Sequence, residues 1–177
     1  MADDFGQDLI AFLPNLRRFA ISLCKSRDVA DDLVQETCEK ALANRGGYQP
    51  GTRMDAWLFR IMRNAWIDRT RRQRTEGVKT DIDDAHFLVG QDGAAVTEAR
   101  ITLDETARAI AALPDDQREV LMLVSVEALS YKEAADILEV PIGTVMSRLA
   151  RARKKIIDGA GIDGSAGRSA DKKGFAQ

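Results

Sequence analysis

Side chains that bind phosphate are concentrated on one side of a predicted helix near the end of the chain. Residues 142–157 contain no Asp or Glu, so nothing within this segment repels a nucleic-acid backbone. Its apolar positions, at spacings of four, three and four residues, are Val145, Leu149, Ala152 and Ile156. Its polar positions include Ser147, Arg148, Arg151, Lys154 and Lys155. This pattern favours DNA binding over the alternative, an ordinary helical hairpin with a solvated basic face.

A helix-turn-helix is the arrangement that would place this basic helix in a DNA major groove. Ser130 and Glu133 have the spacing of a capping box, which predicts a preceding helix that begins at Tyr131. Pro141 cannot continue that helix, so the basic helix begins directly after it. The turn between them contains Glu139, where such motifs often have glycine. The turn therefore uses different dihedral angles or carries a left-handed strain of roughly 1–2 kcal/mol.

A second basic surface is predicted upstream, on a helix that runs from Thr52 or Arg53 to about Arg72. Between Arg53 and Arg74 the chain has seven arginines against two aspartates, which favours phosphate binding over a solvated face. The polar positions are Arg60, Arg63, Asn64 and the cluster Arg69, Arg71, Arg72 and Arg74. Trp57 belongs to the apolar stripe and is expected in the core. Trp66 is expected to pack, with stacking on an unpaired base as the alternative.

The segment before this helix, residues 44–53, is rich in glycine and other turn-forming residues. Its glycines allow the backbone to approach a ligand closely, and Tyr48 and Gln49 are candidates for contacting an extruded base. By itself the loop is weak evidence, because a simple interhelical turn would have the same composition.

An acidic helix is predicted from about Val29 to Ala43, with Asp28 as its N-cap. Between Asp28 and Glu39 there are five acidic residues and no basic one. The polar side of this helix comprises Asp31, Asp32, Gln35 and Glu36. Such a face is suited to a basic protein partner rather than to DNA, and a solvated helix face is the alternative. The net charge of −2 therefore hides blocks of opposite sign, which predict separate surfaces for separate partners.

The sequence has no catalytic or metal-binding pattern. It lacks a phosphate-binding glycine loop, a nucleophile elbow and a zinc-protease motif, and its single histidine, His86, excludes most His-based triads. Cys24 and Cys38 are too few for a disulfide framework and are expected as small core residues. We therefore expect a protein that is not an enzyme and needs no cofactor. With no signal peptide and no apolar run of about 20 residues, we expect a cytoplasmic protein without membrane insertion.

The predicted fold class is all-α, with two small helical domains joined by a flexible linker. The first domain, residues 1–75, begins with a helix over about 5–25 that Pro14 divides or kinks. An acidic segment without helical periodicity, residues 76–97, forms the expected linker. The second domain, residues 98–157, ends in the helix-turn-helix. The Gly- and Ala-rich remainder, residues 158–177, is expected to be a disordered tail.

Four stretches, in this order, resemble the extracytoplasmic-function (ECF) group of bacterial sigma factors. They are DVADDLVQETCEKAL, GTRMDAWLFRIMRNAWIDRTRR, LPDDQREVLMLVSVEALSYKEAADIL and VPIGTVMSRLARARKKI. The resemblance covers nearly all of residues 9–157 and implies a two-domain sigma factor with regions two and four. It implies three partners: core RNA polymerase, through its β′ clamp helices and β flap, promoter DNA, and an anti-sigma factor.

The resemblance also implies roles for individual residues. Contacts with the β′ clamp helices are expected from Asp28, Asp31, Asp32, Gln35 and Glu36. Recognition and melting of the promoter minus-10 element are expected from Tyr48, Arg60, Arg63, Asn64 and Arg71. Contacts with the minus-35 element are expected from Thr144, Ser147, Arg148, Arg151, Lys154 and Lys155. Glu139 departs from the glycine that is common in this turn.

Two other functions remain open at this point. A sigma mimic would bind an anti-sigma factor without serving polymerase, but it would not need the basic faces. An independent helix-turn-helix regulator would bind duplex DNA alone, and it would leave the acidic helix and the arginine-rich helix unexplained.

Overall fold

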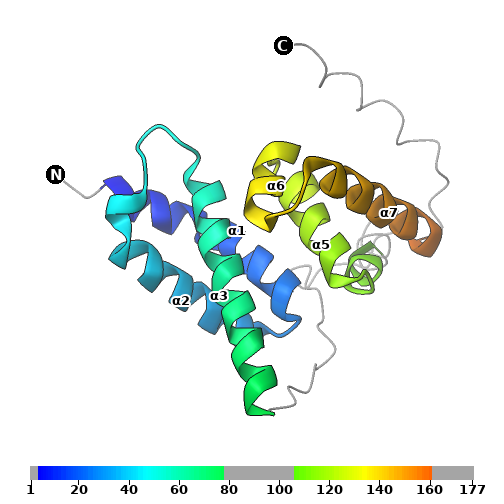
Figure 1. The fold of residues 1–177 in the computed structure, drawn as a ribbon, viewed down its shortest axis with the longest axis horizontal. Helices are drawn as coiled ribbons and strands as arrows, with labels where there is room; N and C mark the ends of the chain where they lie inside the picture. Colours follow the sequence, from blue (N-terminus) through cyan, green and yellow to red (C-terminus); the bar gives the residue numbers. More distant parts are fainter. Residues whose placement is uncertain (1–3, 78–105, 161–177) are drawn as a thin grey trace, which may run out of the picture.

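The computed structural model describes residues 4–77 and 106–160, and every regular element in these ranges is helical (Figure 1). The first range contains α1 (Asp4–Cys24), α2 (Arg27–Ala43), the short 3-10 turn η1 (Arg45–Gly47) and α3 (Met54–Glu76). The second contains a helical segment at 106–111, α5 (Asp115–Leu121), the π-helical turn η2 (Met122–Val126), α6 (Tyr131–Leu138) and α7 (Ile142–Ala160). The predicted all-α fold class is confirmed. The predicted linker from residue 78 onward and the predicted tail from residue 161 onward lie outside the described ranges.

Helices α1, α2 and α3 pack together around an aromatic and aliphatic core. Phe19 of α1 and Phe59 of α3 meet edge to face at the centre, with ring centroids 5.1 Å apart. The other fully buried side chains here include Leu16, Leu33, Leu58 and Met62. Phe59 and Met62 are both fully buried, because α3 is covered on more than one side and its buried face is broader than a single stripe.

Pro14 was expected to divide or kink α1; it lies inside the helix and does not divide it. A proline inside a helix removes the N–H that would bond the carbonyl four residues earlier, here that of Ile10. Ile10 and Pro14 are both exposed, so water can solvate the unpaired carbonyl. The helix therefore continues through the proline on its solvent side.

The start of α2 is also different from the prediction. Ser26, not Asp28, occupies the N-cap position, and it makes no side-chain capping bond. Asp28 lies in the first turn, where its negative charge still interacts favourably with the partial positive charge of the helix N-terminus.

The helix-turn-helix has the predicted form. Ser130 and Glu133 make the reciprocal capping box at the start of α6, which begins at Tyr131. Glu139 adopts a left-handed conformation, with φ 54° and ψ 43°, so the turn carries the strain that the sequence left as one of two possibilities. The apolar sides of α6 and α7 meet, and the residues buried there include Ile137, Leu138, Val145 and Leu149. α7 continues through Ala160, three residues beyond the predicted end.

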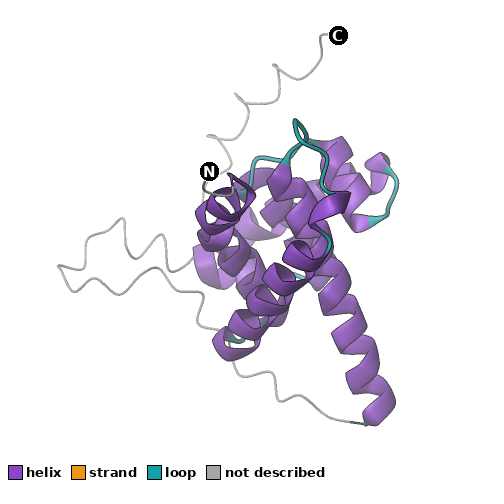
Figure 2. Cartoon of the chain, turned by 90° about the vertical axis from the view of Figure 1, so that its left-hand side faces the viewer, coloured by secondary structure: helices purple, strands orange, loops and turns teal. Residues whose placement is uncertain are grey.

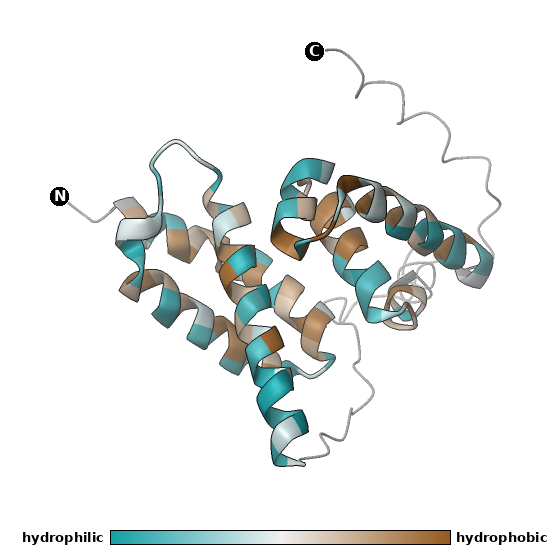
Figure 3. Cartoon of the chain, viewed as in Figure 1, coloured by the Kyte–Doolittle hydropathy of each residue, from teal (hydrophilic) through white to brown (hydrophobic). Residues whose placement is uncertain are grey.

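The helices of residues 4–77 form a first unit and those of residues 106–160 form a second unit, and the two units lie against each other. α1 and α3 contact α5, η2 and α6, and the buried apolar side chains of both units form one cluster. The C-terminal end of α3 projects away from this body (Figures 1 and 2). Figure 3 shows that the projecting end is hydrophilic, in agreement with its high arginine content.

Candidate nucleic-acid interface

The polar side of α7 is solvent-accessible over most of its length. Ser147, Arg151, Lys154 and Lys155 are exposed, whereas Thr144 and Arg148 are half-buried. Arg148 forms an ion pair with Asp116 of α5, with its Nε 3.1 Å from the carboxylate oxygen. The Ser147 hydroxyl donates to the Thr144 carbonyl, 3.1 Å away. The six predicted residues therefore lie on one helix, and one of its arginines is already paired within the protein.

The arginine-rich side of α3 is divided between solvent and the neighbouring unit. Arg60, Asn64 and Arg71 are exposed. Arg63 is largely covered, because its Nε lies 3.1 Å from Glu119 of α5 and its Nη1 lies 3.4 Å from the Ile137 carbonyl of α6. In this arrangement a DNA backbone can reach three of the four predicted α3 residues, and Arg63 only after its ion pair is broken.

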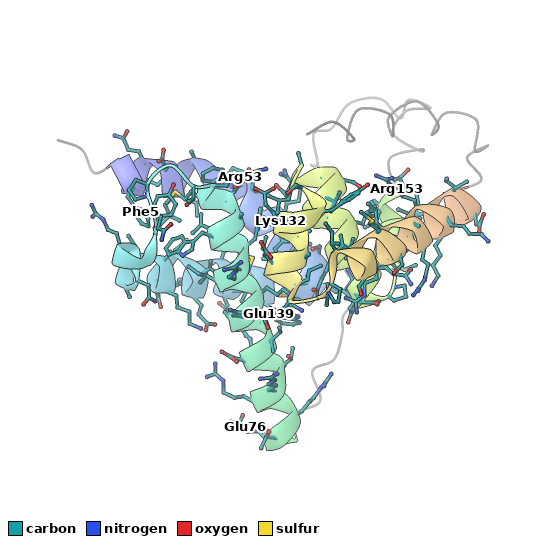
Figure 4. The ribbon with its side chains drawn as sticks, turned by 45° about the horizontal axis from the view of Figure 1, so that its top comes forward. Phe5, Arg53, Glu76, Lys132, Glu139 and Arg153 are labelled. Atoms are coloured by element: carbon teal, nitrogen blue, oxygen red, sulfur yellow. The ribbon has the colours of Figure 1, made fainter. Side chains whose placement is uncertain are left out.

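A cavity of about 400 Å³ separates the 44–53 loop and the first turns of α3 from α6. One wall includes Gln49, Thr52, Arg53 and Arg60, and the other includes Glu133, Asp136 and Ile137. Figure 4 shows Arg53 at the start of α3. Its guanidinium lies within 3.4 Å of the Glu133 carboxylate, although its shorter ion pair, at 2.6 Å, is with Asp55. Basic and hydrogen-bonding groups of the loop region thus face carboxylates of the second unit.

The predicted docking residues of α2 lie together, and most of them are exposed. Asp28, Asp31, Asp32 and Gln35 are exposed, and Glu36 is half-buried. Basic side chains of the same unit partly neutralise this face. The pairs are Arg17 with Asp31 at 2.9 Å, Arg69 with Asp32 at 3.6 Å and Lys40 with Glu36 at 2.8 Å.

Sequence reasoning missed two buried charged residues that join the units. Glu127, after η2, accepts hydrogen bonds from Arg18 at 2.8 and 3.1 Å and from Asn15 at 2.7 Å, both on α1. Arg118 of α5 donates to the Ser22 carbonyl of α1 at 2.6 Å, to the Leu113 carbonyl at 2.7 Å and to Asp115 at 2.6 Å. Their partners on α1 lie about a hundred positions earlier in the chain, so no local spacing could have identified them.

Burial changes the acidity of two groups on or near this interface. It raises the pKa of the Glu119 carboxyl above its ordinary value, although the Arg63 guanidinium opposes the shift. Burial also raises the pKa of the Cys24 thiol to about 12, against a weaker opposing effect from Arg69. Cys24 and Cys38 are both free thiols and are only partly buried, so they are less enclosed than the predicted core positions.

Within residues 4–77 and 106–160, no group of His, Cys, Asp and Glu side chains is arranged to hold a metal ion. None of the helices described for those ranges is long and apolar enough to cross a membrane.

Two family models match the chain, and together they cover more than half of it. Residues 10–76 match sigma-70 region 2, and residues 103–156 match sigma-70 region 4. An ECF RNA polymerase sigma factor, EcfG of Rhodopseudomonas palustris, is 42% identical over 165 residues, or 93% of this chain and 90% of the relative. The ECF sigma factor SigM of Bacillus subtilis is 31% identical over 146 residues, or 82% and 88% of the two chains.

Solved structures have the same architecture. The sigma factor RpoE of Bartonella quintana, solved in complex with the anti-sigma factor NepR, matches with a TM-score of 0.75 at 36% identity. The match covers 90% of this chain and 98% of that one. PhyRSL of Sphingomonas sp. Fr1, solved with NepR, matches with a TM-score of 0.63 at 25% identity, over 89% and 90% of the two chains. With both sigma regions matched in order and ECF relatives aligned along most of its length, the chain belongs to the ECF sigma factors of the sigma-70 family.

Proposed function

We propose that this sigma factor holds a promoter at two points, with α3 and its preceding loop at the minus-10 element and α7 at the minus-35 element. The observation that carries the proposal is the presence of two basic helical surfaces on separate units, with an acidic surface on a third helix. Basic surfaces bind the DNA backbone, and the acidic surface is available to a basic protein. The protein is a specificity subunit for polymerase rather than an enzyme, and it acts in the cytoplasm, where bacterial promoters are transcribed.

The acidic side of α2 is the proposed docking surface for the β′ clamp helices of core polymerase. The intramolecular pair between Arg17 and Asp31 is about half-exposed on both sides. Exposed pairs of this kind contribute at most about 1 kcal/mol each, so a basic partner can replace them at little cost. Asp28 and Gln35, which are also exposed, complete this surface together with Asp32.

Polymerase binding is proposed to separate the two helical units. Arg63 is paired with Glu119, and Arg53 is in contact with Glu133, so carboxylates of the second unit occupy the place of DNA phosphates on the first. The first unit would present its whole basic face only after these contacts are broken. Since the Bartonella quintana relative was solved with an anti-sigma factor, we propose that an anti-sigma protein controls this chain too, by stabilising the paired units.

A sigma mimic is the second candidate function, because PhyRSL also binds NepR and resembles this chain. The basic sides of α3 and α7 are unnecessary in a mimic. Capture of core polymerase separates the two functions, since only a sigma factor needs to bind it.

The test is a binding titration of the full chain with core RNA polymerase. We predict that the double variant Asp31→Lys, Asp32→Lys loses at least about tenfold in affinity, because like charges would then face the basic clamp helices. Asp8→Lys, Asp68→Lys is the matched control, since both of its sites are exposed and lie off the docking face. Equal losses in the two variants would contradict the docking surface. A wild-type chain that binds an anti-sigma protein but not core polymerase would be a mimic.

A further inference from the structure

The loop of residues 44–53 rests on a cluster of three aromatic rings. Phe5, in the first turn of α1, is only 8% exposed. Its ring centroid lies 6.0 Å from that of Tyr48 in the loop and 6.1 Å from that of Trp57 on α3. Tyr48 and Trp57 are 5.5 Å apart, so each ring contacts the other two. Figure 4 shows Phe5 at the end of α1 that lies beside this loop.

Hydrogen bonds close the loop around the same tyrosine. The Tyr48 hydroxyl donates to the Thr52 carbonyl at 2.9 Å, across the tip of the loop. The amide and the hydroxyl of Thr52 both donate to the Gln49 carbonyl, at 3.1 and 2.7 Å. Between them Gly51 has a backbone φ of 90°, a conformation that residues other than glycine rarely adopt. The tip of the loop therefore has a defined shape before any ligand binds.

The start of the loop is attached to the same cluster. The Arg45 guanidinium lies 5.6 Å from the centre of the Phe5 ring, within the range of a cation–π interaction. The Tyr48 amide donates to the Arg45 carbonyl at 3.2 Å, which joins the short η1 turn to the tyrosine. Phe5 thus contacts both the beginning and the middle of the loop from beneath.

These contacts already use the hydroxyl and ring of Tyr48 inside the protein. The side chains that the loop presents to the cavity are Gln49, Thr52 and Arg53, all exposed and across from Glu133; Arg53 is already paired with Asp55. We propose that Phe5 and Tyr48 are positioning residues, which set the minus-10 specificity of this sigma factor by fixing Gln49 and Thr52 without contacting a base themselves. This inference rests on the proposed function and assigns a role in DNA recognition to α1, which has no DNA-facing residues among those predicted from the sequence.

The test compares variants in run-off transcription with core polymerase on two promoter libraries, one randomised at the minus-10 element and one at the minus-35 element. Phe5→Ala should lower discrimination at the minus-10 element about tenfold, because one ring of the cluster is lost. Discrimination at the minus-35 element and affinity for core polymerase should stay unchanged. Tyr48→Phe keeps the ring contacts and should restrict the loss to about threefold. Gln49→Ala should change which base is preferred.

A second measurement needs no polymerase. Hydrogen exchange of the Thr52 amide should be slow in the wild-type chain and in Gln49→Ala, and fast in Phe5→Ala. Phe5→Leu is the variant to use if Phe5→Ala lowers the thermal midpoint of the first unit. It retains buried apolar volume and should give the same loss of minus-10 discrimination.

The inference is overturned when Phe5→Ala and Phe5→Leu keep wild-type minus-10 discrimination while Tyr48→Ala loses it. That result would mean that Tyr48 reads the base directly. A wild-type chain that gives no promoter-dependent transcript would instead contradict the proposed function, and slow exchange at Thr52 would still report the cluster's effect on the loop.

Discussion

Glu127 connects the two helical units through a buried carboxylate. It is 6% exposed, and its three hydrogen bonds all come from Asn15 and Arg18 of α1. Burying a carboxylate without such partners would cost free energy. Glu127 can therefore be buried only while the two units are in contact, and its hydrogen bonds stabilise that contact.

We predict that Glu127→Gln loosens the interface. The glutamine can still accept a hydrogen bond, but Arg18 loses its charged partner. Arg18 is about half-exposed and water screens part of the pair, so the expected loss is about 1 kcal/mol of unfolding free energy. Urea denaturation measures this loss, and small-angle X-ray scattering should show a larger radius of gyration.

Asp68→Asn is the control for this substitution, because it makes the same chemical change at an exposed site on α3. A Glu127→Gln chain as compact and as stable as this control would show that the contact with α1 contributes nothing to closure.

The polar residues of α7 could be predicted individually because a helix places positions three and four apart on the same side. Arg118 and Glu127 could not. Charged residues are usually exposed, and only partners from α1, distant in sequence, explain why these two are buried. The same reason applies to the contact of Arg63 with Glu119, a partner 56 positions away in the chain; its predicted contact with DNA stays a prediction.

At the scale of elements, the turn of the helix-turn-helix contains a backbone strain that lowers stability by a measurable amount. Glu139 is left-handed at the C-cap of α6, and its amide donates to the Ala135 carbonyl. Glycine adopts this conformation without steric penalty, although it loses more entropy on folding.

We predict that Glu139→Gly raises the unfolding free energy by about 0.5–1 kcal/mol, since relief of strain outweighs the added entropy. Glu139→Ala removes the charge but keeps the strain, so its stability should differ little from wild type. Thermal denaturation of both variants is the measurement. A stability gain in Glu139→Ala equal to that in Glu139→Gly would assign the effect to charge and not to the backbone.

Helix starts with explicit chemistry were predicted better than those without it. The capping box at Ser130 and Glu133 identified the start of α6 correctly. At α2 the acidic Asp28 suggested an N-cap, yet the N-cap is Ser26, two residues earlier, with no side-chain hydrogen bond to mark it. Pro14 was expected to divide or kink α1, and the helix is not divided, because exposure of the Ile10 turn lets it continue.

At the scale of the whole molecule, charges of opposite sign lie on different helices. The acidic α2, the arginine-rich α3 and the basic side of α7 were evident as blocks in the sequence. Their relative placement was not, because it depends on contacts between units that are remote in the chain. Those contacts place Glu119 and Glu133 against arginines of the proposed minus-10 surface, so under the proposed function closing the units and binding a promoter would compete for the same side chains.

Run-off transcription with purified core polymerase tests most directly whether the chain binds a promoter at both its minus-10 and minus-35 elements. The templates are a promoter mapped for this sigma factor, the same promoter altered only at its minus-10 element, and a third version altered only at its minus-35 element. The chain should produce a transcript from the intact promoter and a much weaker one from each altered promoter. The double variant Arg151→Ala, Lys154→Ala should weaken transcription from the intact promoter and from the promoter altered at minus-10. From the promoter altered at minus-35 it should weaken transcription little further. A transcript that depends on only one of the two elements would contradict binding at both. The absence of any transcript that requires the chain would contradict it too.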